Sequence, residues 1–167
     1  MGGAQIAVKD DDPVFAATNP AALNPMMDGH VTFNHNFFLS DIQHGYVAYV
    51  QNLDKLGFTV QGGLQYIKYG DMNRADEFGN ILGKVKASET AFTLGGARAL
   101  TDKFSLGLNL RLAVSTLDVY QATALLADAG VMYADSARKL TIGLVLRNAG
   151  AQMTTYNETR ENLPLDV

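Results

Sequence analysis

The chain has 167 residues and a formal net charge of −4 at neutral pH. Charged residues make up 18% of it, below the roughly 25% that is usual in soluble domains, whereas 47% of the residues are apolar. This composition excludes a disordered chain. Because Lys and Arg are not clustered, the chain also lacks the electrostatic pattern of a nucleic-acid-binding protein. The absence of cysteine excludes disulfide scaffolds, thiolate metal sites and cysteine nucleophiles.

Residues 1–30 precede the regular pattern of the chain. The start lacks the basic and long apolar regions of a secretory signal, so we expect a protein that stays inside the cell or one whose signal is missing from this chain. Asp12 stands before Pro13, which favours the start of a short helix through residues 15–17. We therefore expect a plug-like segment over residues 1–30, followed by a β-domain over residues 31–167.

The main signal is an alternation with a period of two residues. Between residues 104 and 115 every second residue is large and apolar, and the others are small or polar. Such a pattern places the two sets on opposite faces of a β-strand. The same alternation recurs at residues 58–66 and 140–147 and, more weakly, at 31–39, 45–51, 89–100 and 121–133. It predicts seven strands, which are antiparallel because most of their connections are short.

Connection lengths differ between the two edges of the predicted sheet. The turns at residues 52–56, 100–103 and 134–139 are brief, whereas residues 70–88 are predicted to form a long loop on the other edge. This asymmetry is typical of outer-membrane barrels, which have short periplasmic turns and longer external loops. Residues 163–167 are expected to begin an eighth strand. The sequence thus predicts an all-β fold, an incomplete transmembrane antiparallel up-and-down β-barrel, with a small eight-stranded barrel as the alternative.

The polarity of the two faces favours a membrane barrel over a soluble one. The polar residues of the strands are mainly Ser, Gly, Asn, Gln and Thr, while most charges lie in turns. Such a face would be a poorly solvated exterior, so we expect the apolar face to contact lipid and the small polar face to line the lumen. Leu108→Arg should then be costly and Asn109→Arg milder. The polar lumen residues, which either brace the wall or line a solute path, are predicted to be Gln61, Gln65, Asn109, Arg111, Asp128 and Arg147.

No motif of the chain carries recognisable catalytic chemistry. A nucleophile elbow, a His-Glu-x-x-His motif and a phosphate-binding loop are all absent from the sequence. We therefore predict a non-enzymatic protein without a cofactor. Asp71, Asp76 and Glu77 supply oxygen atoms of the kind that calcium binds, but they match no calcium-loop pattern, so a solvated acidic loop is the preferred interpretation.

Apolar residues in the same predicted loop suggest a second role for it. An apolar cluster in a long loop often marks a partner-binding site, although such a loop can also fold back over the mouth of a barrel. The predicted docking residues are Asp76, Glu77, Phe78, Gly79, Asn80, Ile81 and Leu82.

Three segments resemble a known family. Residues 10–23, with the motif Asn19-Pro20-Ala21, resemble the start of the fatty-acid-transporter-like (FadL-like) outer-membrane barrels. Segments within residues 69–89, and residues 143–164, resemble the PorQ branch of the PorV/PorQ family of type IX secretion barrels. Together the segments cover the chain from end to end in matching order.

The resemblance implies a bacterial outer-membrane barrel of about fourteen strands, of which this chain is the N-terminal half. It also implies a non-enzymatic role at the cell surface, where the barrel, surrounded by outer-membrane lipid, holds a surface protein of the type IX attachment complex. Two alternatives stay open. The first is a FadL-like transporter of hydrophobic solutes, and the second is a soluble β-barrel that carries a small apolar ligand.

Overall fold

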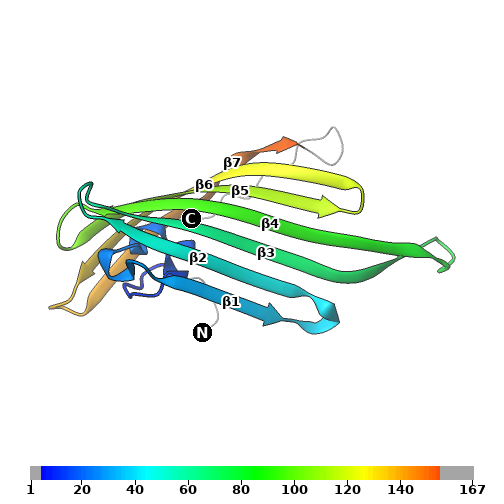
Figure 1. Ribbon diagram of the computed structural model, residues 1–167, viewed down its shortest axis with the longest axis horizontal. Coiled ribbons are helices and arrows are strands. Elements are labelled where there is room, and N and C mark those ends of the chain that lie inside the picture. Colours follow the sequence, from blue (N-terminus) through cyan, green and yellow to red (C-terminus); the bar gives the residue numbers. More distant parts are fainter. Residues whose placement is uncertain (1–4, 155–167) are drawn as a thin grey trace.

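The computed structural model describes residues 5–154, except for the side chains of residues 71 and 75. Its strands pair in sequence order into one antiparallel sheet, which confirms the predicted all-β, up-and-down arrangement. The sheet is curled but open, with β1 and β7 as its edges (Figure 1). The predicted eighth strand lies outside the described residues. The seven described strands are β1 (Val31–Phe37), β2 (Gln43–Leu53), β3 (Phe58–Ala75), β4 (Ile81–Ala99), β5 (Phe104–Leu117), β6 (Tyr120–Asp135) and β7 (Leu140–Thr154).

Alternation along each strand gives the sheet two unlike faces. The inner face is defined here as the one that contacts the N-terminal segment, and the outer face is the opposite one. On the outer face Leu94 is 71% exposed and Leu144 is 63% exposed, whereas Asn109 on the inner face is fully buried. The large apolar side chains therefore point away from the packed side of the sheet, as the sequence pattern predicts.

The N-terminal segment packs against the inner face near the short turns. It contains α1 (Val14–Thr18), η1 (Pro20–Ala22) and η2 (Pro25–Met27), and η1 contacts β4, β5 and β6. The predicted short helix is confirmed as α1, and the Asp12 carboxylate accepts a hydrogen bond from the Val14 N–H at 2.9 Å. Among the described residues, no helix is long and apolar enough to cross a membrane.

Two small apolar clusters join this segment to the wall. Ala16, Leu23 and Met27 pack with Val50 of β2 and Ala97 of β4. In the second cluster, Ala21 and Ala22 pack against Met132 of β6. The interior of the described fold thus lies between the N-terminal segment and the inner face.

The predicted long loop over residues 70–88 is wrong. β3 continues to Ala75 and β4 begins at Ile81, so the two strands form a long hairpin that projects past β2 and β5 (Figure 1). A β-bulge between Tyr69 and Met72 interrupts the ladder and breaks the period of two, which is why the alternation was not visible in the sequence. At the same end of the sheet, η3 (Leu39–Asp41) connects β1 to β2.

Candidate functional site

Three glycines on the inner face of neighbouring strands pack directly against the N-terminal segment. Gly107 of β5 and Gly130 of β6 are directly paired, and Gly143 of β7 pairs with Met132 of β6. A Cβ on Gly107 would overlap the backbone of Pro20 and Ala21. Substitution there therefore requires the segment to move. We call this group the glycine seat; its members are Gly107, Gly130 and Gly143.

The Asn19-Pro20-Ala21 motif occupies the glycine seat. Asn19 is fully buried, and its side chain accepts a hydrogen bond from the Ala21 N–H at 2.9 Å and donates one to the Ile6 carbonyl at 2.6 Å. Ser105 of β5 donates from its hydroxyl to the Ala21 carbonyl at 2.7 Å. These bonds satisfy polar groups that would otherwise be costly to bury, so the motif is a fitted part of the inner face.

Gln61 of β3 and Asn109 of β5 bond to each other across β4 and connect both strands to α1. Gln61 Nε2 donates to Asn109 Oδ1 at 3.0 Å, and Asn109 Nδ2 donates to the Ala16 carbonyl at 3.1 Å. Gly95 leaves the space that the Asn109 amide fills. Asn109 is fully buried and bonded on both sides, so its place on the inner face no longer supports the expectation that Asn109→Arg is mild.

A second polar group braces β5, β6 and β7. Arg111 Nη2 pairs with the Asp128 carboxylate, which is 1% exposed, and the other Asp128 oxygen accepts from the Asn148 N–H at 2.8 Å. The ladder between β6 and β7 shifts here, and Asn148 has a positive φ of 59°. Sequence periodicity did not predict this bulge, which brings a backbone N–H onto a buried charge.

The remaining predicted lumen residues lie elsewhere on the same face. Gln65 lies with its amide 3.0 Å from His44 Nε2, and Arg147 is half-buried beside the bulge. The six predicted polar residues therefore do not form one cluster. Four of them lie together, because Gln61 bonds to Asn109, Arg111 pairs with Asp128, and Asn109 lies directly opposite Asp128 on the neighbouring strand.

The tip of the β3–β4 hairpin contains the predicted docking residues. The Asp76 carboxylate accepts hydrogen bonds from the Asn80 side chain at 2.9 Å, the Asn80 N–H at 2.8 Å and the Phe78 N–H at 3.0 Å. These bonds, first that from the Asn80 side chain, hold the pKa of Asp76 below its ordinary value. Gly79 closes the turn with a φ of +84°. Asp76 thus shapes the turn.

The hairpin tip presents apolar side chains to solvent. Phe78 is 81% exposed, and Ile81 and Leu82 at the start of β4 are similarly open. Glu77 is also exposed, while the side chain of Asp71 lies outside the described residues. Among the described side chains, no three His, Asp or Glu groups come together in a way that could hold a metal ion.

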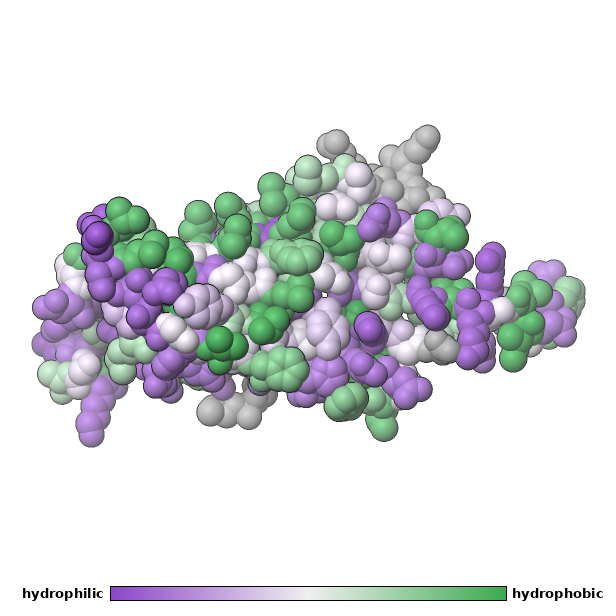
Figure 2. All heavy atoms as spheres, viewed as in Figure 1, coloured by the Kyte–Doolittle hydropathy of each residue, from purple (hydrophilic) through white to green (hydrophobic). Residues whose placement is uncertain are grey.

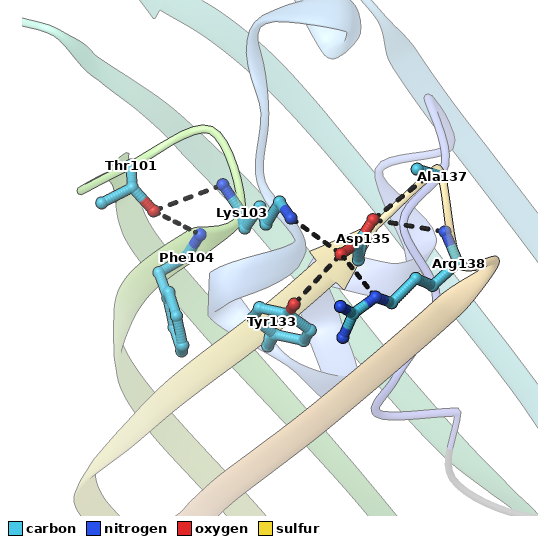
Figure 3. A network of polar contacts seen from close by, with 7 residues as sticks. All are labelled: Thr101, Lys103, Phe104, Tyr133, Asp135, Ala137 and Arg138. Carbon is cyan, nitrogen blue, oxygen red and sulfur yellow. Dashed lines mark hydrogen bonds and ion pairs between the residues drawn. The ribbon is translucent and has the colours of Figure 1, made fainter.

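Asp135 organises the turns at the other end of the sheet (Figure 3). Its carboxylate, which is almost fully enclosed, accepts from Lys103 Nζ at 2.8 Å and from the Tyr133 hydroxyl at 3.2 Å. It also accepts from the backbone N–H groups of Ala137 and Arg138 in the β6–β7 turn. One side chain therefore connects two neighbouring turns. The sequence offered only the presence of an Asp at the start of a turn as a signal.

The Lys103–Asp135 pair predicts a pH dependence of stability. The hydrogen bond from Lys103 lowers the pKa of Asp135, and the same bond raises the pKa of Lys103. Asp135 therefore stabilises the folded state above the ordinary carboxyl pKa, and this stability is lost as the pH falls through the lowered pKa of the folded protein. The stability that Lys103 contributes is lost only at high pH, as the pH rises through its raised pKa. We expect Asp135→Asn to flatten the fall in the melting temperature of the full-length protein between about pH 5 and pH 2. Asp102→Asn, a neighbouring exposed carboxylate, is the control, and an unchanged acid slope in Asp135→Asn would contradict the assignment.

A cavity lies between the N-terminal segment and the turn ends of β3, β4 and β5. Its volume is about 630 Å³. Its lining combines apolar side chains, among them Leu23, Leu100 and Phe104, with the charged side chains of Lys9, Asp54, Arg98, Asp102 and Lys103.

Comparisons with protein-family models, curated proteins and solved structures found no match to this chain. The resemblance to the PorV/PorQ family therefore stays a prediction.

Proposed function

We propose that the seven strands form part of an outer-membrane β-barrel of the PorV/PorQ type, which anchors a surface partner of the type IX secretion machinery and catalyses no reaction. The observation that carries the membrane part is the exposed apolar outer face. Figure 2 shows apolar side chains over the middle of the sheet and hydrophilic ones gathered toward the turn end. Exposed apolar residues on neighbouring outer rows include Phe92, Leu94, Leu108, Leu110, Leu112, Leu125, Ile142 and Leu144. Lipid is the solvent that such a continuous surface favours.

The height of this surface matches a hydrocarbon layer. The outer apolar positions of β5 run from Phe104 to Val114. Ten steps of about 3.3 Å span roughly 33 Å along the strand. A strand tilt of about 40° reduces that length to a height of roughly 25 Å, which is the height of the apolar band in outer-membrane barrels.

Aromatic side chains near both ends of the band support the same placement. Phe104 and Tyr133 pack with their ring centroids 4.9 Å apart near the short turns, where the Arg98 guanidinium also lies 5.4 Å from the Phe58 ring centroid. Near the other end, Tyr66 covers Gly45 and bonds to His35. Aromatic girdles at the two interfaces are typical of transmembrane barrels.

Closure of the barrel requires further strands. The described β1 and β7 are both sheet edges. An open edge in lipid leaves N–H and C=O groups unpaired, at a cost of several kcal/mol each. The proposal therefore includes additional strands between these two edges.

The inner face favours an anchor over a transporter. Its middle is occupied by the N-terminal segment and by bonded polar groups, of which Asn109 and Asp128 are fully or almost fully buried. The β3–β4 hairpin, by contrast, projects an exposed apolar tip at the end where external loops are expected. We assign partner binding to that tip.

The triple variant Phe78→Ser/Ile81→Ser/Leu82→Ser tests the assignment. It leaves the Asp76 and Asn80 turn bonds in place, so we expect the full-length protein to reach the outer membrane at an unchanged level. Because the apolar tip is lost, we expect several-fold less partner protein attached at the cell surface. The measurement is the amount of surface-attached type IX substrate on cells that carry each variant as their only copy.

Val119→Ser supplies the control, because Val119 is also highly exposed and lies in the β5–β6 turn at the same end of the sheet. Unchanged surface attachment in the triple variant would remove partner binding from the hairpin tip. Recovery of the wild-type protein in a soluble fraction without detergent would overturn the membrane proposal itself.

A further inference from the structure

Two lysines lie on the outer face just beyond the apolar band, at the hairpin end. Lys68 of β3 follows Leu64 and Tyr66 on the same face, before the bulge that begins at Tyr69. It pairs with Ser88 of β4, and Lys86 stands two residues from Ser88 on that same face. Both lysines are exposed. Lys68 and Lys86 are therefore diagonal neighbours across the two strands.

No described carboxylate forms an ion pair with either lysine, although Asp118 lies beside Lys86 and donates its backbone N–H to the Lys86 carbonyl at 2.9 Å. The ion pairs between described side chains are Lys103–Asp135, Arg138–Asp135 and Arg111–Asp128, so Lys68 and Lys86 belong to none of them. Glu89 points to the opposite face, where its carboxylate accepts from the Tyr69 hydroxyl at 3.1 Å.

Neutral polar groups flank the two lysines on the outer face. Gln43 of β2 pairs with Lys68, and Thr116 of β5 pairs with Ser88. Amide and hydroxyl groups of this kind can donate hydrogen bonds to phosphate or sugar oxygens. The rim at the short turns differs, because there acidic and basic residues are mixed and Asp135 pairs with two cations.

We infer that Lys68 and Lys86 bind the phosphate groups of a phosphorylated glycolipid in the outer leaflet. The inference rests on the proposed membrane function and adds a lipid ligand to it. Lipid headgroups lie at the border of the apolar band, where a lysine can extend its ammonium group while its stem stays against the apolar surface. The positive charge of the lysines complements the negative phosphates, and the site continues directly from the face assigned to lipid.

Binding of lipid A to the full-length protein in detergent tests the inference. The probes are diphosphorylated lipid A, the same lipid with its phosphates removed, and inorganic phosphate alone. We expect the wild-type protein to prefer the diphosphorylated form. Lys68→Gln/Lys86→Gln should weaken that binding by roughly 10- to 30-fold, because each lysine near an anionic lipid surface is worth about 1 kcal/mol.

Lys55→Gln/Lys139→Gln is the matched control, since both residues are exposed at the turn end of the sheet. We expect it to bind diphosphorylated lipid A as the wild-type protein does. Equal affinity of the wild-type protein for the lipid without phosphates, or unchanged binding by Lys68→Gln/Lys86→Gln, would overturn the inference. If inorganic phosphate bound as tightly as diphosphorylated lipid A, the site would be one for a free anion and not for a glycolipid. A protein that fractionates with the outer membrane but shows no preference for phosphate refutes the lipid site alone, whereas a protein absent from that membrane refutes both proposals.

Discussion

Leu108→Arg is expected to destabilise the full-length protein in lipid vesicles by about 2–4 kcal/mol. Leu108 lies in the middle of the outer apolar positions of β5 and is 50% exposed in the described fold. An arginine there places its charge at the centre of the hydrocarbon layer, where it must draw in water or headgroups. Urea unfolding of vesicle-inserted protein, followed by circular dichroism, measures the change in the free energy of unfolding.

Ala113→Arg on the same strand is the control for face orientation. Ala113 lies on the inner face beside a cavity of about 220 Å³ that Gln65 and Glu89 also line. An arginine there has room and a nearby carboxylate, so we expect a loss well below that of Leu108→Arg. Equal losses in both variants would mean that the outer face does not contact lipid.

Gly107→Ala is expected to release the N-terminal segment from the glycine seat. The added Cβ meets backbone atoms of Pro20 and Ala21, which cannot rotate away as a side chain would. Overpacking of this kind costs about 1–3 kcal/mol, which corresponds to an increase of roughly 5- to 150-fold in the opening of the segment. Hydrogen exchange at the Ala22 and Leu23 amides, which bond within the segment, reports that opening.

Gly96→Ala is its matched control. Gly96 pairs with Leu108 on the adjacent strand, and a Cβ there meets its nearest atom, a Val60 methyl carbon, at 3.8 Å. We expect unchanged exchange in the N-terminal segment and unchanged strand protection. If hydrogen exchange in the N-terminal segment were as slow in Gly107→Ala as in the wild-type protein, the glycine seat would not be the contact that keeps the segment in place.

The number of strands and the polarity of their faces could be predicted because both depend on the local alternation of apolar with small or polar residues. β5 is the clearest case, since six apolar residues alternate with six small or polar ones and the structure exposes five of the apolar ones, from Phe104 to Leu112. The outer half of the β3–β4 hairpin could not be predicted in this way. A bulge after Tyr69 and the positive φ of Gly83 remove the period of two from that stretch.

The inner face was predictable as a list of residues but not as a set of contacts. Gln61, Asn109, Arg111 and Asp128 were all expected to face inward, and they do. Their partners depend on the path of the N-terminal segment and on the bulge at Asn148, neither of which has a local sequence pattern. The glycine seat had a signal that was overlooked, namely glycines at inward positions of three neighbouring strands.

The contacts of the glycine seat also set an order of events in folding. The bond from Ser105 to the Ala21 carbonyl spans 84 residues, and that from Asn109 to the Ala16 carbonyl spans 93. The Ala21 carbonyl accepts from β5, and the Ala16 carbonyl accepts from Gln61 of β3 as well as from Asn109 of β5. Contacts between residues so far apart in sequence form late because the intervening chain must first be ordered. The part of the described chain that is synthesised first is therefore placed last, and correct pairing of the wall is a precondition for docking it.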